Sequence, residues 1–348
     1  MLKKLSDERH LPPLRSREEM LEILQREEYG YMPKKPDAVS FSETDDIETK
    51  LFCAGDATLK RVDITVTLDG ADFTFPIYAA VPTAEGKHPF FICINFRDNV
   101  PDKYIPTEEI INNGFAVISF CYNDVTKDNG DFGDGLAALL YKNGERGECD
   151  AGKIAMWAWA AQRAMDYADT NPALDTKRAC VCGHSRLGKA ALLCSATDER
   201  FAFAYSNDSG CSGAALSRGK QGESIANICK TFPYWFCENY KKYSSHEYEQ
   251  PHDQHYLLAS IAPRYVIVGS ADKDLWADPL SEMLCCLAAS EAYEKMGLDG
   301  FVCDGSLPTP PATYFDGNIG YHVRHGEHFF SRRDWNKLIE FINQKQKS

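Results

Sequence analysis

The chain has 348 residues, of which 44% are hydrophobic and 26% are charged, so it can bury a sizeable core and has neither a disordered nor a fibrous composition. The 51 acidic residues exceed the 38 basic ones and give a net charge of −13. Such a surface repels nucleic-acid phosphates and anionic lipids. We therefore expect neither nucleic acid nor a membrane as a partner.

The N-terminal residues and the cysteines bear on the compartment. Residues 1–20 contain lysines with no apolar stretch behind them, unlike a secretory signal. The thirteen cysteines are an odd number without paired metal-ligand spacing, and Cys93, Cys180 and Cys182 fall in expected strands. Reduced cysteines of this kind are typical of the cytoplasm, where we expect the chain to act. A leader trimmed from the sequence would leave secretion open.

The first part of the chain predicts a helix followed by a β-hairpin. Residues 17–28 have helical periodicity and begin at a capping box formed by Ser16 and Glu19. Two alternating stretches meet at an Asp-Gly turn within 68–71, which predicts a hairpin. We expect residues 1–50 to form a helical and extended segment that packs on the rest.

After the hairpin, apolar runs and helical patterns alternate. Short apolar runs predict strands that are buried on both faces, at 89–96, 115–122, 178–185, 201–207 and 264–270. Helical patterns lie at 153–168, 188–197 and 279–296. This alternation predicts an α/β protein with a mainly parallel central sheet and helices on both faces, in a single domain of residues 1–348. Two long connections, 123–150 and 305–318, are expected to wall a site.

The stretch GHSRLG, residues 183–188, joins an expected strand to an expected helix. In α/β-hydrolases the nucleophilic serine lies on such a turn, flanked by small residues and exposed at the helix N-terminus. Gly183 and Gly188 provide the small residues, so Ser185 is the candidate nucleophile. The alternative role for such a serine is a simple helix N-cap.

A serine nucleophile needs a histidine base and an acid that orients it, in the chain order serine, acid, histidine. His328 lies in the expected loop before the last helix and is the candidate base, with His325 as the second choice and His322 assigned to a strand. Asp274 and Asp208 each follow an expected strand, and either can be the acid or close a local turn.

Several motifs taken together resemble the glucuronoyl esterase family, carbohydrate esterase family fifteen, and especially its bacterial branch. They are GHSRLGKAALL, NDSGCSGAAL, FPYWF, HDQHYLLASIAPR, DLWADP and HGEHFF, which lie within residues 183–330. The resemblance as a whole covers roughly residues 85–345. The resemblance implies an α/β-hydrolase fold and the cleavage of esters of glucuronic or 4-O-methyl-glucuronic acid, such as those between xylan and lignin alcohols. It implies a small-molecule or oligosaccharide uronate ester as substrate and no cofactor.

The resemblance also assigns roles around the nucleophile. Arg186 takes the place of an arginine that stabilises the oxyanion, and a cation near the developing alkoxide acts only as charge appears. Lys189 matches a lysine that binds uronic acid hydroxyls. Glu223 takes the place of a Gln or Glu on the same ring, and Trp276 that of a tryptophan that contacts the sugar.

Two departures from the family affect the site. Fungal members carry a disulfide between the residues at positions 184 and 329, where this chain has His184 and Phe329. This correspondence aligns His328 with the catalytic histidine. The family acid after the earlier strand is often Glu, and Asp208 is shorter by one methylene at a site that tolerates about half an ångström. We therefore favour Asp274 as the acid.

The sequence also allows a possible metal site and two alternative functions. His246, His252 and His255 suggest a metal cluster, but the resemblance makes them structural and we expect no metal. An acetyl esterase that acts on xylan oligosaccharides would keep the same serine, histidine and acid with a smaller acyl pocket. A hydrolase fold retained for carbohydrate binding without turnover is the alternative from another class.

Overall fold

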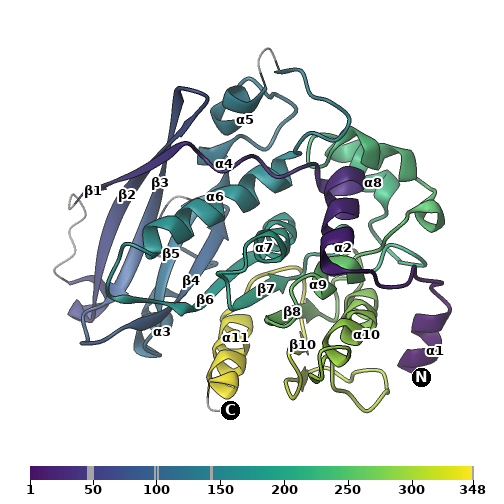
Figure 1. Ribbon diagram of the computed structural model, residues 1–348. Helices are drawn as coiled ribbons and strands as arrows, with labels where there is room; N and C mark the ends of the chain where they lie inside the picture. The colour runs from purple at the N-terminus through teal and green to yellow at the C-terminus, as the bar shows by residue number, and fades with distance from the viewer. Residues whose placement is uncertain (45–50, 98, 100–101, 142–143, 347–348) are drawn as a thin grey trace.

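One mixed sheet organises the computed structural model, which describes residues 1–44, 51–97, 99, 102–141 and 144–346. Its strands are β1 (Ala38–Thr44), β2 (Ala57–Leu68), β3 (Ala71–Pro82), β4 (His88–Asn95), β5 (Ala116–Cys121), β6 (Leu174–His184), β7 (Phe203–Asn207), β8 (Tyr265–Ala271), β9 (Ala312–Tyr314) and β10 (Ile319–Arg324). They lie in the order β1-β2-β3-β5-β4-β6-β7-β8-β10-β9 (Figure 1). The neighbours from β5 to β10 are parallel, and the remaining pairs are antiparallel.

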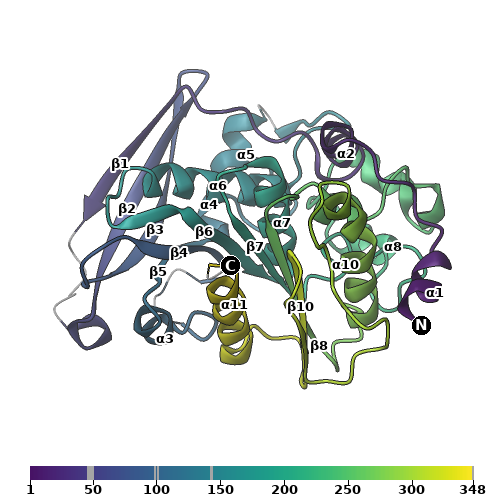
Figure 2. The same cartoon turned by 60° about the horizontal axis from the view of Figure 1, so that its bottom comes forward.

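Helices cover both faces of this sheet. The α-helices are α1 (Leu2–Asp7), α2 (Arg17–Leu24), α3 (Thr107–Asn112), α4 (Tyr122–Val125), α5 (Gly135–Leu140), α6 (Lys153–Ala168), α7 (Arg186–Thr197), α8 (Ile225–Thr231), α9 (His255–Ala259), α10 (Pro279–Glu294) and α11 (Arg332–Lys345). Figure 2 shows α3 and α11 on one side of the sheet and α6, α7 and α10 on the other. One apolar cluster packs against the sheet on each side, and the two form the core. The predicted fold class is confirmed, while the boundary of one domain at 1–348 stays a prediction.

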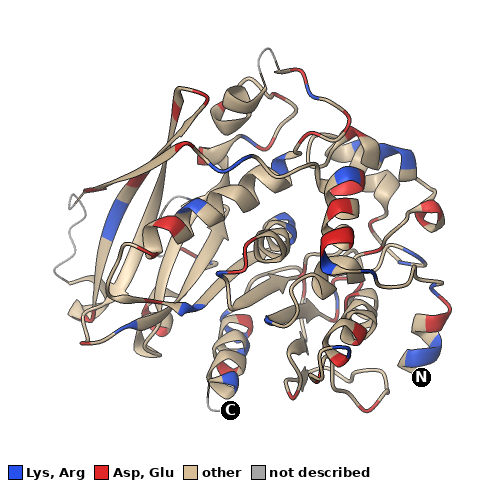
Figure 3. Cartoon of the chain, in the orientation of Figure 1, with Lys and Arg blue, Asp and Glu red and all other residues tan. Residues whose placement is uncertain are grey.

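The central strands owe their burial to composition. β4, β5 and β7 contain no Lys, Arg, Asp or Glu, and every residue in them is buried. Figure 3 shows the charged residues mostly on the surrounding helices and loops. Among the described residues, no helix combines the length and the apolar character that a membrane crossing requires.

The predicted hairpin is present as β2 and β3. Leu68 pairs with Ala71, and the two residues between them, Asp69 and Gly70, have φ angles of 51° and 77°. Positive φ at both positions is the geometry that an Asp-Gly turn supplies. Because β3 also pairs with β5, the hairpin extends the central sheet.

The two long connections, 123–150 and 305–318, lie in different parts of the structure. Residues 123–150 include part of α4 and all of α5, and their Asp128 reaches the nucleophile turn described below. Residues 305–318 include β9, which pairs with β10 at the edge of the sheet. Pairing with β10 keeps 305–318 at the sheet edge. No residue of 305–318 and no described residue of 123–150 lines the pocket that contains Ser185, so the expectation that these segments wall the pocket directly is wrong.

The N-terminal segment is held on the body by buried hydrogen bonds. The helix begins at the predicted capping box of Ser16 and Glu19 but is α-helical only to Leu24, and it continues as a π-helical turn at Gln25–Tyr29. That turn directs the Glu28 carboxylate inward, where it accepts hydrogen bonds from His252 Nε2 at 2.7 Å and Gln254 Nε2 at 2.8 Å. Glu28 and both partners are fully buried. These contacts attach α2 to the segment before α9.

The Glu28 contact predicts a large loss of stability on truncation. We expect Glu28→Ala to lower the free energy of unfolding by about 3 kcal/mol, because removing one partner leaves buried polar groups without their hydrogen bonds. Urea denaturation followed by tryptophan fluorescence measures the change. Glu18→Ala, on the exposed face of α2, is the matched control and should cost less than about 0.5 kcal/mol. Equal losses in the two variants would contradict the assignment.

Candidate active site

Ser185 is the single residue between the end of β6 and the start of α7. Its φ and ψ are 57° and −126°, a strained conformation for a residue other than glycine. Its backbone N–H donates to Asn207 O at 2.8 Å, and its carbonyl accepts from Gly188 N at 2.9 Å. The strand, turn and helix around the serine are those that the sequence predicts, and such a turn presents the hydroxyl at the carboxyl edge of the sheet.

Close contacts explain the two glycines of the turn. A Cβ on Gly183 would lie 2.2 Å from Leu187 O, and a Cβ on Gly188 would lie 2.8 Å from Ser206 Oγ on β7. Both distances are impossible for a real side chain, so the turn requires glycine at each position. The second glycine stands one residue later than in the usual hydrolase motif because its place is fixed by packing against β7.

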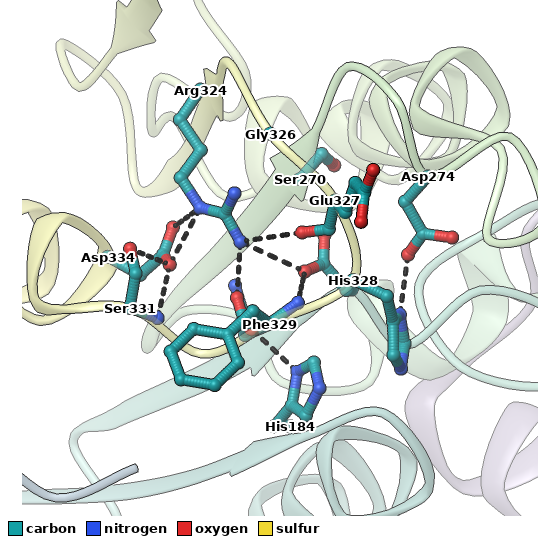
Figure 4. A network of polar contacts seen from close by, with 12 residues as sticks. His184, Ser270, Asp274, Arg324, Gly326, Glu327, His328, Phe329, Ser331 and Asp334 are labelled. Atoms are coloured by element: carbon teal, nitrogen blue, oxygen red, sulfur yellow. Dashed lines mark hydrogen bonds and ion pairs between the residues drawn. The ribbon is translucent and has the colours of Figure 1, made fainter. Parts of the chain in front are cut away.

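His328 and Asp274 form a hydrogen-bonded pair beside this turn. His328 Nδ1 lies 2.6 Å from Asp274 Oδ2 (Figure 4). Burial by itself raises the pKa of Asp274, but the hydrogen bond and charge of His328 outweigh it and leave this pKa below its ordinary value. The ionised carboxylate accepts a hydrogen bond from Nδ1–H, which keeps the proton on Nδ1 and leaves His328 Nε2 as the basic nitrogen.

Asp208 supports the backbone next to His328 and not the ring. It follows β7, is 1% exposed, and its Oδ2 accepts from the Phe329 N–H at 3.3 Å. Burial, together with the nearby charges of Glu282 and Asp274, raises the pKa of Asp208 well above its ordinary value. The geometry therefore favours Asp274 as the acid that orients the histidine.

The second-choice base, His325, makes a similar pair in a different place. Its Nδ1 lies 2.7 Å from Asp272 Oδ2, and its side chain is mostly exposed. The pocket that contains Ser185 is lined by His328 and not by His325. His322 lies in β10, as expected, and its Nε2 is 3.0 Å from the Tyr205 hydroxyl.

One pocket of about 360 Å³ brings every predicted site residue together. The residues that line it include Ser185, Arg186, Lys189, Asp208, Glu223, Asp274, Trp276 and His328. They come from the turn after β6 and the start of α7, from the loops after β7, β8 and β10, and from the segment before α8. The pocket thus places the candidate nucleophile, the candidate base, carboxylates and two cations around a single cavity.

Lys189 is held in the pocket wall by backbone carbonyls. It is 2% exposed, donates to Ser209 O at 2.6 Å and to Cys211 O, and lies 3.8 Å from Glu223 Oε2. An ammonium group has three donors, so two fixed bonds orient the third. Trp276 on the same pocket is 56% exposed and offers a flat apolar surface to a ligand.

Arg186 has a partner that sequence reasoning missed. Its guanidinium pairs with the Asp128 carboxylate and lies over the Trp235 ring, 4.7 Å from the ring centroid. Trp235 Nε1 donates to the same carboxylate at 2.7 Å. The fully buried Lys153 donates to Lys127 O and Asp131 O and so pins the loop that carries Asp128. The only sequence signal for this contact is the length of the connection at 123–150.

His184, which directly precedes Ser185, packs its ring against that of His328. It is buried, its Nδ1 lies 2.7 Å from Asn207 Oδ1, and its ring centroid is 4.4 Å from that of His328. Burial and the neighbouring His328 lower the pKa of His184 to about 3. A neutral His184 does not oppose protonation of His328. Phe329, which directly follows His328, packs on Tyr104 with 5.4 Å between the ring centroids.

The histidines suggested as a metal cluster have separate partners. His246 contacts Glu249, His252 contacts Glu28, and His255 Nε2 contacts Pro12 O. Within the described ranges, the donor atoms of Asp208, Asp274 and His328 lie within 4.8 Å of one another. His328 Nδ1 and Asp274 already bond to each other there, so this group fits acid–base chemistry better than a metal.

Comparison with known proteins agrees with this geometry. A family described as "Glucuronyl esterase, fungi" matches residues 64–297. A carbohydrate esterase from an unknown prokaryotic organism is 41% identical over 240 residues, which cover 68% of this chain and 55% of that relative. This chain therefore spans about half of that relative's length.

Two solved structures are similar over nearly the whole chain. A glucuronoyl esterase from Solibacter usitatus is 31% identical, with a TM-score of 0.85, and covers 94% of this chain and 92% of that one. A glucuronoyl esterase variant from Sporotrichum thermophile, in complex with methyl 4-O-methyl-β-D-glucopyranuronate, is 26% identical, with a TM-score of 0.71 and coverage of 94% and 80%.

The sheet order, the strand–serine–helix turn and the loops that follow its strands define an α/β-hydrolase. Within that class, the match over most of the chain identifies the family. The chain belongs to the glucuronoyl esterase family, in its bacterial branch.

The two acids can be ranked by substitution. We expect Asp274→Asn to lower kcat by about 10⁴-fold, because an amide cannot hold the histidine tautomer that leaves Nε2 basic. Asp208→Asn should cost much less, since its contact is to the Phe329 backbone. Steady-state kinetics on any ester that the protein hydrolyses measures both, and the reverse ranking would transfer the orienting role to Asp208.

The roles of Arg186 and Asp128 can be distinguished by substitution in the same way. If the guanidinium stabilises an oxyanion, Arg186→Met should lower kcat by about 10²-fold with little change in KM. Asp128→Asn keeps the cation and should cost far less. Equal losses of kcat in the two variants would mean that Arg186 serves only as the partner of Asp128.

Proposed function

We propose that this chain is a serine carboxylic-ester hydrolase that cleaves glucuronic acid and 4-O-methyl-glucuronic acid esters. The observation that carries the proposal is the arrangement of Lys189 and Glu223 in the same pocket as Ser185 and His328. A uronate ester has its sugar on the acyl side of the scissile bond. Polar groups next to the nucleophile are therefore where such a substrate needs them. Membership of the family and the ligand of the Sporotrichum thermophile relative support the same substrate class.

The first half of the reaction acylates the serine. Ser185 Oγ attacks the ester carbonyl carbon while its proton passes to His328 Nε2, and the C=O electrons move onto oxygen. Arg186 and the N–H groups at the start of α7 stabilise that oxyanion. Because Asp128 and Trp235 already hold the guanidinium, no rearrangement is required when the charge develops.

Acylation is complete when the oxyanion collapses, the C–O bond to the alcohol breaks, and the alcohol leaves with the proton from His328. The second half hydrolyses the acyl-enzyme and regenerates Ser185. A water molecule then gives its proton to His328 and attacks the acyl carbon, which frees the uronic acid and returns the proton to Ser185. Lys189 and Arg186 offset the repulsion between the product carboxylate and an acidic protein. The cytoplasm stays our prediction for where this happens.

The specificity of the pocket predicts how activity depends on Lys189. We expect kcat/KM for benzyl glucuronate to exceed that for p-nitrophenyl acetate once leaving-group reactivity is allowed for. A site built to bond sugar hydroxyls loses affinity for a substrate that lacks them. Lys189→Ala should lower kcat/KM for benzyl glucuronate about 10- to 100-fold, as expected for loss of a hydrogen bond to a charged group. The same substitution should lower kcat/KM for p-nitrophenyl acetate much less.

Controls separate this specificity from a general loss of function. Ser185→Ala should abolish hydrolysis and labelling by a fluorophosphonate probe, and the fraction of labelled protein normalises each variant. Glu223→Gln tests the same subsite without disturbing the carbonyl contacts of Lys189. Equal losses on both esters, or a wild-type preference for acetylated xylo-oligosaccharide, would favour an acetyl esterase. No turnover on any ester would favour a carbohydrate-binding protein.

A further inference from the structure

Arg324 ends β10, four residues before His328, and its guanidinium makes polar contacts through both Nε and Nη2. The residue is 8% exposed and does not line the pocket that contains Ser185. Figure 4 shows its guanidinium behind the loop that carries His328. Any effect of this group on the reaction must therefore be transmitted through that loop.

One edge of the guanidinium is fixed to the last helix. Arg324 Nε lies 3.0 and 2.8 Å from the two carboxylate oxygens of Asp334, which is fully buried in the first turn of α11. Asp334 also accepts from the backbone N–H and the hydroxyl of Ser331, each at 2.7 Å. The end of β10 and the start of α11 are thus joined through one carboxylate.

The other edge contacts the backbone on both sides of His328. Arg324 Nη2 donates to Glu327 O at 3.1 Å and to Phe329 O, and it lies 3.5 Å from Asp208 Oδ2. Asp208 in turn accepts from the Phe329 N–H. The residues before and after the histidine are therefore both tied to the same cation.

Gly326 makes room for this arrangement. It has a φ of +138°, and a Cβ there would lie 2.5 Å from Arg324 Nη1. The loop is also joined to the loop after β8, because Gly326 N donates to Asp272 Oδ1 at 2.9 Å and Lys273 N donates to Gly326 O at 3.0 Å.

His328 depends on such support because burial does not hold it. Its side chain is 44% exposed, and Asp274 fixes only one of its ring nitrogens. A base that must take a proton from Ser185 has to stay within about half an ångström of its working position. The backbone that carries the ring must therefore be held in place by contacts other than those of the ring itself.

We infer that Arg324 is a positioning residue that holds the backbone on both sides of His328 and so keeps the base in register with Ser185. The inference rests on the proposed function only in taking Ser185 and His328 as the reacting pair. A planar guanidinium is required, since its Nε and Nη2 donors reach Asp334 and two carbonyls together, while its charge lies near Asp208. An ammonium keeps the charge but cannot make these contacts at once.

The test compares Arg324→Lys with Arg333→Lys. Arg333 is exposed on α11 and provides the same substitution nine positions further along. We expect Arg324→Lys to lower kcat per titrated active site by about 10²-fold, as for a reacting group displaced by about an ångström. KM should change by less than about twofold, because the residue does not contact substrate. The control variant should match the wild type.

Active sites are titrated to completion with a fluorophosphonate, so that loss of folded protein is removed from kcat. A deficit that disappears on titration, an unchanged kcat, or an equal effect of Arg333→Lys would overturn the inference. Asp334→Asn is the second variant, and it should give a smaller fall in kcat with KM unchanged, because it weakens only one edge of the contact. An unchanged kcat in that variant would also contradict the inference.

The readouts distinguish this inference from the proposed specificity. Each variant is assayed on benzyl glucuronate and p-nitrophenyl acetate, and the rate of fluorophosphonate labelling reports on the serine–histidine pair without any turnover. If the wild type hydrolyses only the acetate, the uronate specificity fails, while the effect of Arg324 is still measured. If labelling of Arg324→Lys is as fast as that of the wild type, the positioning role fails whatever the substrate.

Discussion

The parallel order of β6, β7, β8 and β10 is the constraint on which the whole site depends. Parallel neighbours point the same way, so the loops that follow them leave the sheet at one edge. Ser185 follows β6, Asp208 follows β7, Asp274 follows β8 and His328 follows β10. Residues far apart in the chain thereby meet around one pocket, and each is carried by a strand that is buried on both faces.

Charged groups at that edge are buried and paired, which makes the arrangement rigid. Arg324 lies between Asp208 and Asp334, and Lys189 bonds to backbone carbonyls. Burial raises the pKa of Glu282 to about 7, and that carboxyl accepts from Gly210 N and Ser270 Oγ below the pocket. Removing one partner of such a set leaves an uncompensated polar group, so each contact restricts the positions open to the others.

Side-chain packing joins the turn around Ser185 to the loop that carries His328. His184 contacts the His328 ring, and Phe329 contacts Tyr104. Aromatic pairs contribute about 0.5–1.5 kcal/mol beyond their burial and do not depend on redox state. All thirteen cysteines lie within the described residues and are free thiols. The site therefore keeps its geometry without an oxidised bond.

The sequence by itself determined the alternation of strands and helices, the hairpin and the turn around Ser185, because periodicity and small residues act over a few neighbouring positions. It also supplied both candidate acids. Only the tertiary structure decided between them, since Asp274 and Asp208 follow adjacent strands and differ in which atom of the His328 loop they reach. Asp128 and Arg324 were not predicted, because their partners lie on other elements. Strand order and side-chain pairing are long-range properties, and no local pattern encodes them.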